Sequence, residues 1–140
     1  MEREQGIKLM QDLLRRMVER KGSDLFITAG FPPAIKVDGE IKPQTNQPLT
    51  PEQAQLLVRA IMNDRQTKEF DATKECNFAI APPGIGRFRV SAFVQQGKIG
   101  MVLRTIPATL PTIDSLGLPQ VLKDVALTKR GLCILVGATG

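Results

Sequence analysis

The fold is decided in residues 87–105, which read RFRVSAFVQQGKIGMVLRT. Apolar and polar residues alternate on both sides of Gln96-Gly97, a pattern typical of an antiparallel hairpin closed by a two-residue turn. That turn sets Arg89 directly opposite Arg104 on one face and Val90 opposite Leu103 on the other. A four-residue loop in its place would still leave both arginines on one face. Arg87 joins the first of these faces. The stretch therefore predicts one arginine face and one buried apolar face.

The arginine face needs an explanation, because like charges facing each other across strands are destabilising by up to about 1 kcal/mol. Arg87, Arg89 and Arg104 call for an anion, and the planar guanidinium suits phosphate oxygens. A solvated face neutralised by acidic residues from elsewhere is the alternative, and the pattern alone favours it slightly. In either case we expect both Arg89 and Arg104 on the solvent side, where replacement by Ala costs little stability.

Working outward, further short strands are expected on both sides of the hairpin. Residues 24–28 and 35–41 alternate, and the second stretch contains an Asp38-Gly39 hairpin turn. Residues 76–80 alternate as well.

Amphipathic periodicity predicts a first helix over residues 7–21, with Gly22 as its C-cap. A second helix is expected to begin at Thr50-Pro51-Glu52-Gln53, which forms a capping box. Helical turns follow at 65–70, and a further amphipathic helix over 116–127 is expected to break near Gly117 and to restart at Pro119. The fold class predicted is α+β: an antiparallel sheet with helices on one face.

The C-terminal residues carry a second pattern. Residues 132–136 are continuously apolar, which is typical of a strand buried on both faces. Gly137, Ala138, Thr139 and Gly140 follow as a phosphate-binding loop would begin. The full pattern needs a second glycine, then Lys and Ser or Thr, so an ordinary strand-to-turn exit remains the stronger explanation from these residues alone.

Composition removes several function classes. The 140 residues hold no His and two cysteines, Cys76 and Cys133, without a CxxC pair. His-based triads and His-ligated metals are therefore excluded, and no metal site is expected. Aromatic residues are 4%, which disfavours a stacking platform for single strands. The net charge of +5 favours an anionic partner. With no apolar run near ~20 residues and no signal-peptide pattern, we expect a cytoplasmic protein.

Several separated motifs resemble one family in the right order. They are Ser23-Asp24-Leu25, Ala29-Gly30-x-Pro32-Pro33, Val37-Asp38-Gly39, Gly86-Arg87-Phe88-Arg89-Val90, Arg104-x-Ile106 and Arg130-Gly131-Leu132. Together they resemble the N-terminal part of the type IV pilus retraction ATPases, the PilT/PilU branch of the secretion ATPases. Residues 75–78 and 137–140 are more similar to the PilU side, as is Phe26 where PilT-type chains commonly have His.

The resemblance implies a PAS-like N-terminal domain over residues 1–108, an interdomain linker and helix over 109–130, and the start of a RecA-like ATPase domain over 131–140. It implies a twitching-motility motor that is a cytoplasmic homohexamer, peripheral to the inner-membrane pilus machinery. Other subunits, a related retraction ATPase and pilus platform proteins would be its partners, and nucleic acid would not.

In that family, arginines of the N-terminal domain reach the nucleotide phosphates. The matching catalytic positions are Arg89 and Arg104, with Arg87 and the loop 137–140 as nucleotide-binding companions. The family's cofactors are ATP and Mg²⁺, and its Walker lysine and Mg²⁺-binding acids would lie beyond Gly140. The 140 residues alone are therefore not expected to hydrolyse ATP or to hold these cofactors, whereas the parent enzyme would.

Two other functions stay open. A stand-alone PAS-like module for ligand sensing or protein interaction would need an internal cavity with converging polar groups. A nucleic-acid-binding hairpin would show a steep salt dependence, but the lack of exposed aromatics counts against it.

Overall fold

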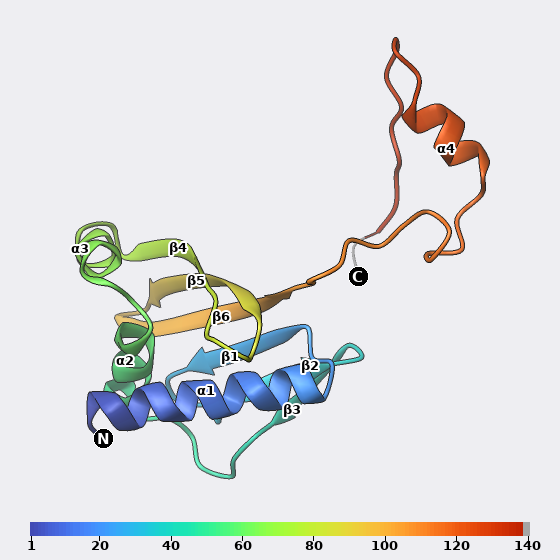
Figure 1. The fold of residues 1–140 in the computed structure, drawn as a ribbon. Helices are drawn as coiled ribbons and strands as arrows, with labels where there is room; N and C mark the ends of the chain where they lie inside the picture. The colour runs from blue at the N-terminus through green and yellow to red at the C-terminus, as the bar shows by residue number, and fades with distance from the viewer. Residues whose placement is uncertain (139–140) are drawn as a thin grey trace. The chain divides into compact units, whose positions relative to one another are not determined.

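The computed structural model describes residues 1–138. The chain divides into two compact units, Met1–Ile106 and a second unit that begins at Pro107. The first unit holds three helices and all six strands (Figure 1). The helices are α1 (Arg3–Glu19), α2 (Pro51–Ala60) and α3 (Asp64–Thr73). The strands are β1 (Asp24–Thr28), β2 (Ala34–Val37), β3 (Glu40–Pro43), β4 (Glu75–Ile80), β5 (Arg87–Gln95) and β6 (Lys98–Ile106).

The strands form one sheet in the order β3-β2-β1-β6-β5-β4, and every neighbouring pair is antiparallel. The sheet places β1, near the start of the chain, beside β6, the last strand. Because this pairing joins distant segments, short-range turn signals contain no information about it. The predicted α+β class with an antiparallel sheet and flanking helices is confirmed.

Both predicted hairpin turns are confirmed. Gln95 pairs with Lys98, so Gln96 (φ 52°) and Gly97 (φ 73°) form the whole turn in left-handed conformations. Asp38 and Gly39 do the same between β2 and β3, with φ of 49° and 80°. Such two-residue turns match the twist of the flanking strands and fix the register of the hairpin. The facing of Arg89 with Arg104, and of Val90 with Leu103, follows as predicted.

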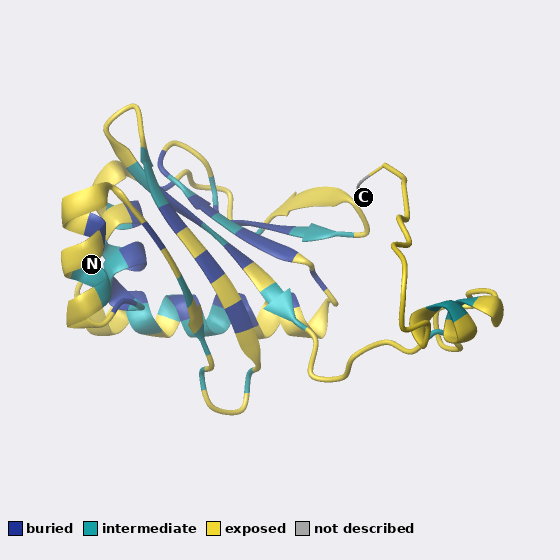
Figure 2. Ribbon diagram, turned by 90° about the horizontal axis from the view of Figure 1, so that it is seen from above, coloured by how far each residue is buried: buried dark blue, intermediate teal, exposed yellow. Residues whose placement is uncertain are grey.

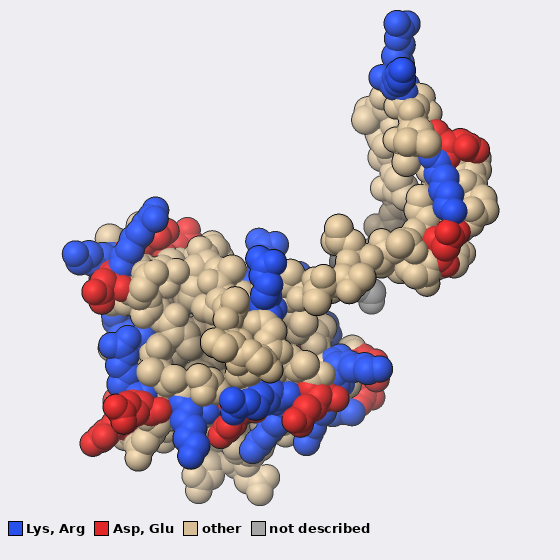
Figure 3. All heavy atoms as spheres, viewed as in Figure 1, with Lys and Arg blue, Asp and Glu red and all other residues tan. Residues whose placement is uncertain are grey.

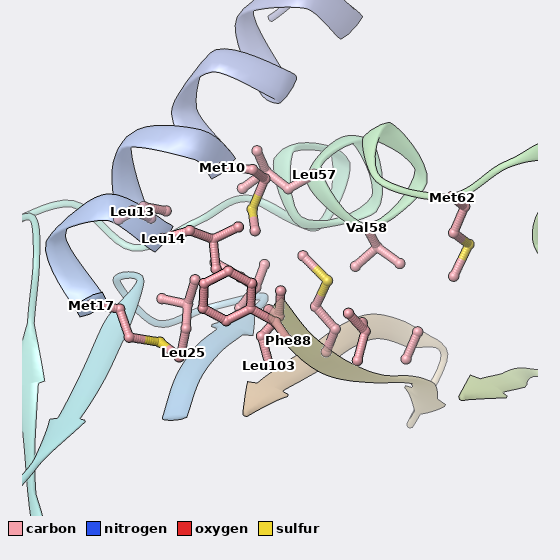
Figure 4. Close-up of a cluster of buried hydrophobic side chains, with 14 of the residues drawn as sticks. Met10, Leu13, Leu14, Met17, Leu25, Leu57, Val58, Met62, Phe88 and Leu103 are labelled. Carbon is pink, nitrogen blue, oxygen red and sulfur yellow. The ribbon is translucent and has the colours of Figure 1, made fainter. Parts of the chain in front are cut away.

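One face of the sheet and the inner faces of α1 and α2 enclose the core (Figure 4). From α1 come Met10, Leu13, Leu14 and Met17, which are at most 1% exposed. The strands contribute the alternate residues, so Leu25, Phe88 and Leu103 are fully buried. Figure 2 shows this alternation of buried and exposed positions along the strands. The opposite face of the sheet is called the outer face below. It carries the residues of the other parity: Asp24, Phe26, Asn77, Ala79, Arg87, Arg89, Ser91, Val102, Arg104 and Ile106.

The end of α1 corrects one prediction. The helix stops at Glu19, and Lys21 rather than Gly22 takes the left-handed conformation (φ 54°). Gly22 is required for a different reason, since an added Cβ would lie 2.5 Å from Cγ2 of Ile35. The glycine therefore allows a close approach of the chain to β2 instead of a cap.

The helices α2 and α3 begin as their sequences indicate. The reciprocal bonds of the capping box join Thr50 and Gln53 at α2, and Asn63 and Gln66 do the same at α3. α3 is longer than expected and extends over ten residues to Thr73. Its buried Phe70 packs into the core.

The second unit contains α4 (Val121–Ala126), which lies inside the segment expected to restart at Pro119, and Gly117 before it has a left-handed φ of 66°. Before it, Asp114 accepts hydrogen bonds from Lys123 (2.8 Å) and Gln120 (2.7 Å), which lower the pKa of its carboxyl. The strand predicted at 132–136 is wrong for the described chain: these residues lie outside any strand and are exposed. A run buried on both faces needs strands on either side, and residues 1–138 pair none with it.

Candidate functional site

The three arginines predicted from the hairpin lie together on the outer face. Arg89 of β5 and Arg104 of β6 are direct cross-strand partners, and Arg87 lies two residues before Arg89, opposite Ile106. All three are exposed. Their positions follow from the two-residue turn, which places odd positions of β5 and even positions of β6 on this face. In Figure 3 a group of basic side chains stands over the β5–β6 part of the sheet.

The sequence pattern did not reveal the carboxylate that forms an ion pair with one of these arginines. Asp24 begins β1 and faces Arg104 in register. Nε of Arg104 donates to Oδ1 of Asp24 at 3.1 Å, and the hydroxyl of Ser23 donates to Oδ2 at 2.8 Å. Among the described residues, Asp24 is the one charged residue that is buried. Its side chain is 9% exposed, whereas that of Arg104 is 72% exposed. A polar pair at a strand start was the only signal, because the partner lies 80 residues away.

A row of charges therefore crosses four strands of the sheet. Lys36 of β2 faces Asp24 of β1, Asp24 faces Arg104 of β6, and Arg104 faces Arg89 of β5. Within residues 1–138, no carboxylate lies at ion-pair distance from Arg89. The row thus ends at Arg89, which has no acidic partner within residues 1–138, beside Arg104, which pairs with Asp24.

A shallow hollow of about 430 Å³ lies next to this pair. Apart from the two arginines, its polar lining is Asn77 of β4 and Ser91 of β5, neighbours in register. An amide, a hydroxyl and two guanidinium groups are donors suited to oxyanions. The two guanidinium groups make the hollow a cationic site.

The shifted pKa values lie away from this hollow. The pKa of Asp71 is lowered mainly by its hydrogen bond from Arg59 (2.7 Å), which links α2 to α3. Burial raises the pKa of the Cys76 thiol, whose side chain is on the core side of β4. Within residues 1–138 no cluster of three metal-ligating residues occurs. The donor groups that line the hollow are suited to binding and orienting an anion.

The second half of the predicted nucleotide site falls in the second unit. Gly137 and Ala138 belong to the second unit, where they are exposed and outside regular structure. Thr139 and Gly140 lie outside the described residues. Among the described residues, no helix has the length and apolar character needed to cross a membrane.

Comparison with known proteins finds type IV pilus ATPases among the relatives. The chain is 58% identical over 130 residues to the type IV pilus ATPase PilU of Pseudomonas aeruginosa, and 41% identical over 129 residues to PilT of the same organism. These matches cover 93% and 92% of this chain but 34% and 38% of the relatives. The chain thus spans about a third of the length of the curated relatives it matches. No protein-family model matches it.

Solved structures agree. The crystal structure of the retraction motor PilT with bound ADP is 34% identical and superposes with a TM-score of 0.71, covering 82% of this chain and 34% of that one. The ATPase DotB of Legionella pneumophila is 25% identical with a TM-score of 0.63, covering 89% and 36%. The sequence and the fold lead to the same assignment: the chain is a PilU-like sequence that corresponds to the N-terminal region of the type IV pilus retraction ATPases.

Proposed function

We propose that this chain is the N-terminal domain of a PilU-like pilus-retraction ATPase and that Arg89 and Arg104 contact the phosphates of ATP in the assembled motor. The observation that carries the proposal is the paired arginines on the outer face, with Arg89 uncompensated within residues 1–138. An arginine that meets developing phosphate charge stabilises the transition state of phosphoryl transfer. Bound ADP in the similar PilT structure supports an adenine nucleotide as the ligand.

The finer parts of the proposal rest on the family resemblance. They are a PAS-like domain over residues 1–108, a linker and helix over 109–130, and the beginning of a RecA-like domain over 131–140. Arg87 and the loop 137–140 are assigned to nucleotide binding, and Mg²⁺ would accompany ATP. The motor would be a homohexamer that works with a related retraction ATPase and platform proteins on the cytoplasmic side of the pilus machinery.

The experiment compares ATP hydrolysis by the full-length protein and its Arg89→Ala variant. Loss of such an arginine lowers kcat by about 10³-fold, while ATP affinity is largely kept. Lys98→Ala is the matched control, because Lys98 is an exposed cation on the same hairpin, beside the turn. If kcat of Arg89→Ala stays within a few-fold of wild type while the control behaves alike, the arginines are a solvated surface and the proposal is wrong.

The sensor and nucleic-acid alternatives gain no support from the described residues. No buried side-chain polar atom there lacks a hydrogen-bond partner, so no polar group is left in the core for a ligand. The hollow at Arg89 is lined by Asn77, Ser91 and aliphatic groups, and Phe78 is the one aromatic residue at its edge. That surface therefore offers little aromatic area on which nucleic-acid bases could stack.

A further inference from the structure

We propose that Asp24 is a positioning residue, which holds the Arg104 side chain so that its terminal nitrogens face the anion bound beside Arg89. This inference rests on the proposed function, since it assigns to Asp24 a part in presenting Arg104 to phosphate. It divides the arginine pair into one anchored and one unanchored member. The two arginines are equivalent in the sequence pattern and unequal in their surroundings.

The first support is the way the carboxylate is bound. Oδ1 of Asp24 accepts from Nε of Arg104 at 3.1 Å, and Oδ2 accepts from the hydroxyl of Ser23 at 2.8 Å. Each oxygen thus has one donor, which fixes the plane of the carboxylate. The bond uses Nε of the guanidinium, and the donors of the two terminal nitrogens remain for a ligand.

Burial shows which partner holds the other. The Asp24 side chain is 9% exposed and that of Arg104 is 72% exposed. A buried carboxylate is surrounded by packed atoms and keeps its place, whereas an exposed arginine without a partner would sample several rotamers. The direction of control is therefore from Asp24 to Arg104.

The backbone that carries Asp24 is itself held between two strands. The amide of Ser23 donates to the carbonyl of Lys36 (2.9 Å), and the amide of Thr105 donates to the carbonyl of Ser23 (3.2 Å). The hydroxyl of Thr105 donates to the carbonyl of Gly22 at 3.1 Å. At Gly22 even a Cβ would meet Ile35 at 2.5 Å. The segment before Asp24 is thus tied to β2 and to the residue next to Arg104.

Arg89 has no such support. Within residues 1–138 it makes no ion pair, and its neighbours in register are Arg104 and Ala79. Asp24 faces Lys36 on its other side. The carboxylate therefore pairs with Arg104 of β6 and faces Lys36 of β2, but it makes no ion pair with Arg89 of β5. A role through Arg104 rather than through Arg89 follows from this order.

The experiment measures kcat and KM for ATP in the full-length protein carrying Asp24→Asn, alone and together with Arg104→Ala. We expect Asp24→Asn to lower kcat about 10-fold or more with KM changed less than about two-fold, since a misplacement of about 1 Å can cost about 100-fold. In the Arg104→Ala background the same change should have no further effect on kcat. Asp12→Asn is the matched control, because Asp12 pairs with Arg15 at 3.4 Å in an exposed ion pair.

A second variant and a second measurement guard against misfolding. Arg104→Lys keeps the charge but lacks Nε, so we expect it to lose kcat as Asp24→Asn does while Asp24 stays intact. In the 140-residue chain, the Nε–H proton of Arg104 should exchange slowly with solvent by NMR. In Asp24→Asn it should exchange as fast as that of Arg89.

The outcomes separate the inference from the proposed function. If Arg104→Ala lowers kcat and Asp24→Asn does not, or if their effects multiply, Asp24 is not a positioning residue. If Nε–H of Arg104 exchanges equally fast in wild type and Asp24→Asn, the anchor itself is absent. If neither Arg89→Ala nor Arg104→Ala changes kcat, the proposed function falls, and slow Nε–H exchange would leave Asp24 a structural residue only.

Discussion

At the scale of single residues, Arg89 and Arg104 face each other but should respond differently to replacement. Arg89→Ala removes an exposed cation and its repulsion with Arg104, so we expect the free energy of unfolding to change by no more than about 0.5 kcal/mol. Arg104→Ala leaves the buried Asp24 carboxylate with Ser23 as its one side-chain donor. Loss of a partner for a buried polar group costs about 1–3 kcal/mol.

The measurement for this pair is urea denaturation of the 140-residue chain and its two variants. Asp24→Asn together with Arg104→Ala is the control, because removing the charge should restore part of the stability lost in Arg104→Ala alone. The strand pattern alone suggested that both arginines are removable at little cost. Equal denaturation midpoints for Arg89→Ala and Arg104→Ala would contradict the larger stability loss expected for Arg104→Ala.

The two cysteines should differ in reactivity. Cys76 is 2% exposed, and burial with the nearby Glu69 carboxylate raises the pKa of its thiol. Cys133 is exposed. We expect iodoacetamide at neutral pH to modify Cys133 within minutes and Cys76 only after the chain is unfolded in urea, as mass spectrometry of the digested protein would show.

The same pKa shift gives a pH dependence with a defined sign. A thiol whose pKa is higher in the folded state contributes stability that is complete below its unfolded pKa of about 8.5. That contribution is lost as the pH rises through the folded value. Cys76→Ser or Cys76→Ala should remove the alkaline loss, and an unchanged profile in Cys76→Ala would contradict this origin.

At the scale of the elements, two glycines that are both close to neighbours should tolerate alanine differently. In Gly22→Ala the new Cβ meets Cγ2 of Ile35 at 2.5 Å and the carbonyl of Lys36 at 3.2 Å. A β-branched side chain and a backbone carbonyl can move away only slightly, so we expect the free energy of unfolding to fall by about 1–3 kcal/mol. In Gly6→Ala the contact is the tip of Leu56, which can rotate, and alanine gains up to about 1 kcal/mol of helix propensity in α1.

Thermal denaturation of both variants checks this contrast. We expect a lower Tm for Gly22→Ala and an unchanged or higher Tm for Gly6→Ala. Each variant serves as the control for the other, since both add one methyl group. Equal losses at both positions would show that the close contacts are not relieved by side-chain rotation at Leu56.

The elements also show how far local patterns reach. Asp38-Gly39 and Gln96-Gly97 fixed two hairpin registers, because a two-residue turn leaves no freedom in pairing. Thr50 and Gln53 gave the start of α2 for a similar reason. The pairing of β1 with β6 was beyond sequence reasoning, since a strand's alternation says which face is buried but not which strand lies beside it.

At the scale of the whole molecule, the hydrophobic core belongs to the Met1–Ile106 unit. The described residues from Pro107 onward contain no buried side chain. The candidate site was predictable where it depended on one hairpin, as for Arg89 and Arg104. It was not predictable where it depended on the sheet order, as for Asp24. The strand expected at 132–136 failed because an apolar run predicts burial without supplying the neighbours that bury it.

The exposure of the arginines limits what the 140-residue chain can bind. Arg89 and Arg104 act on an open face in high-dielectric solvent, where an ion pair contributes on the order of 1 kcal/mol or less. We therefore expect ATP to bind this chain with a Kd of about 1 mM or weaker and without measurable hydrolysis, and to bind more weakly still as salt is raised. An NMR titration at two ionic strengths, with Arg89→Ala for comparison, checks this. Chemical-shift changes of outer-face residues that disappear in Arg89→Ala would place the phosphates at this face. A micromolar Kd at high salt would contradict the expectation, because it would mean that the chain holds a formed nucleotide site of which the outer face is only one part.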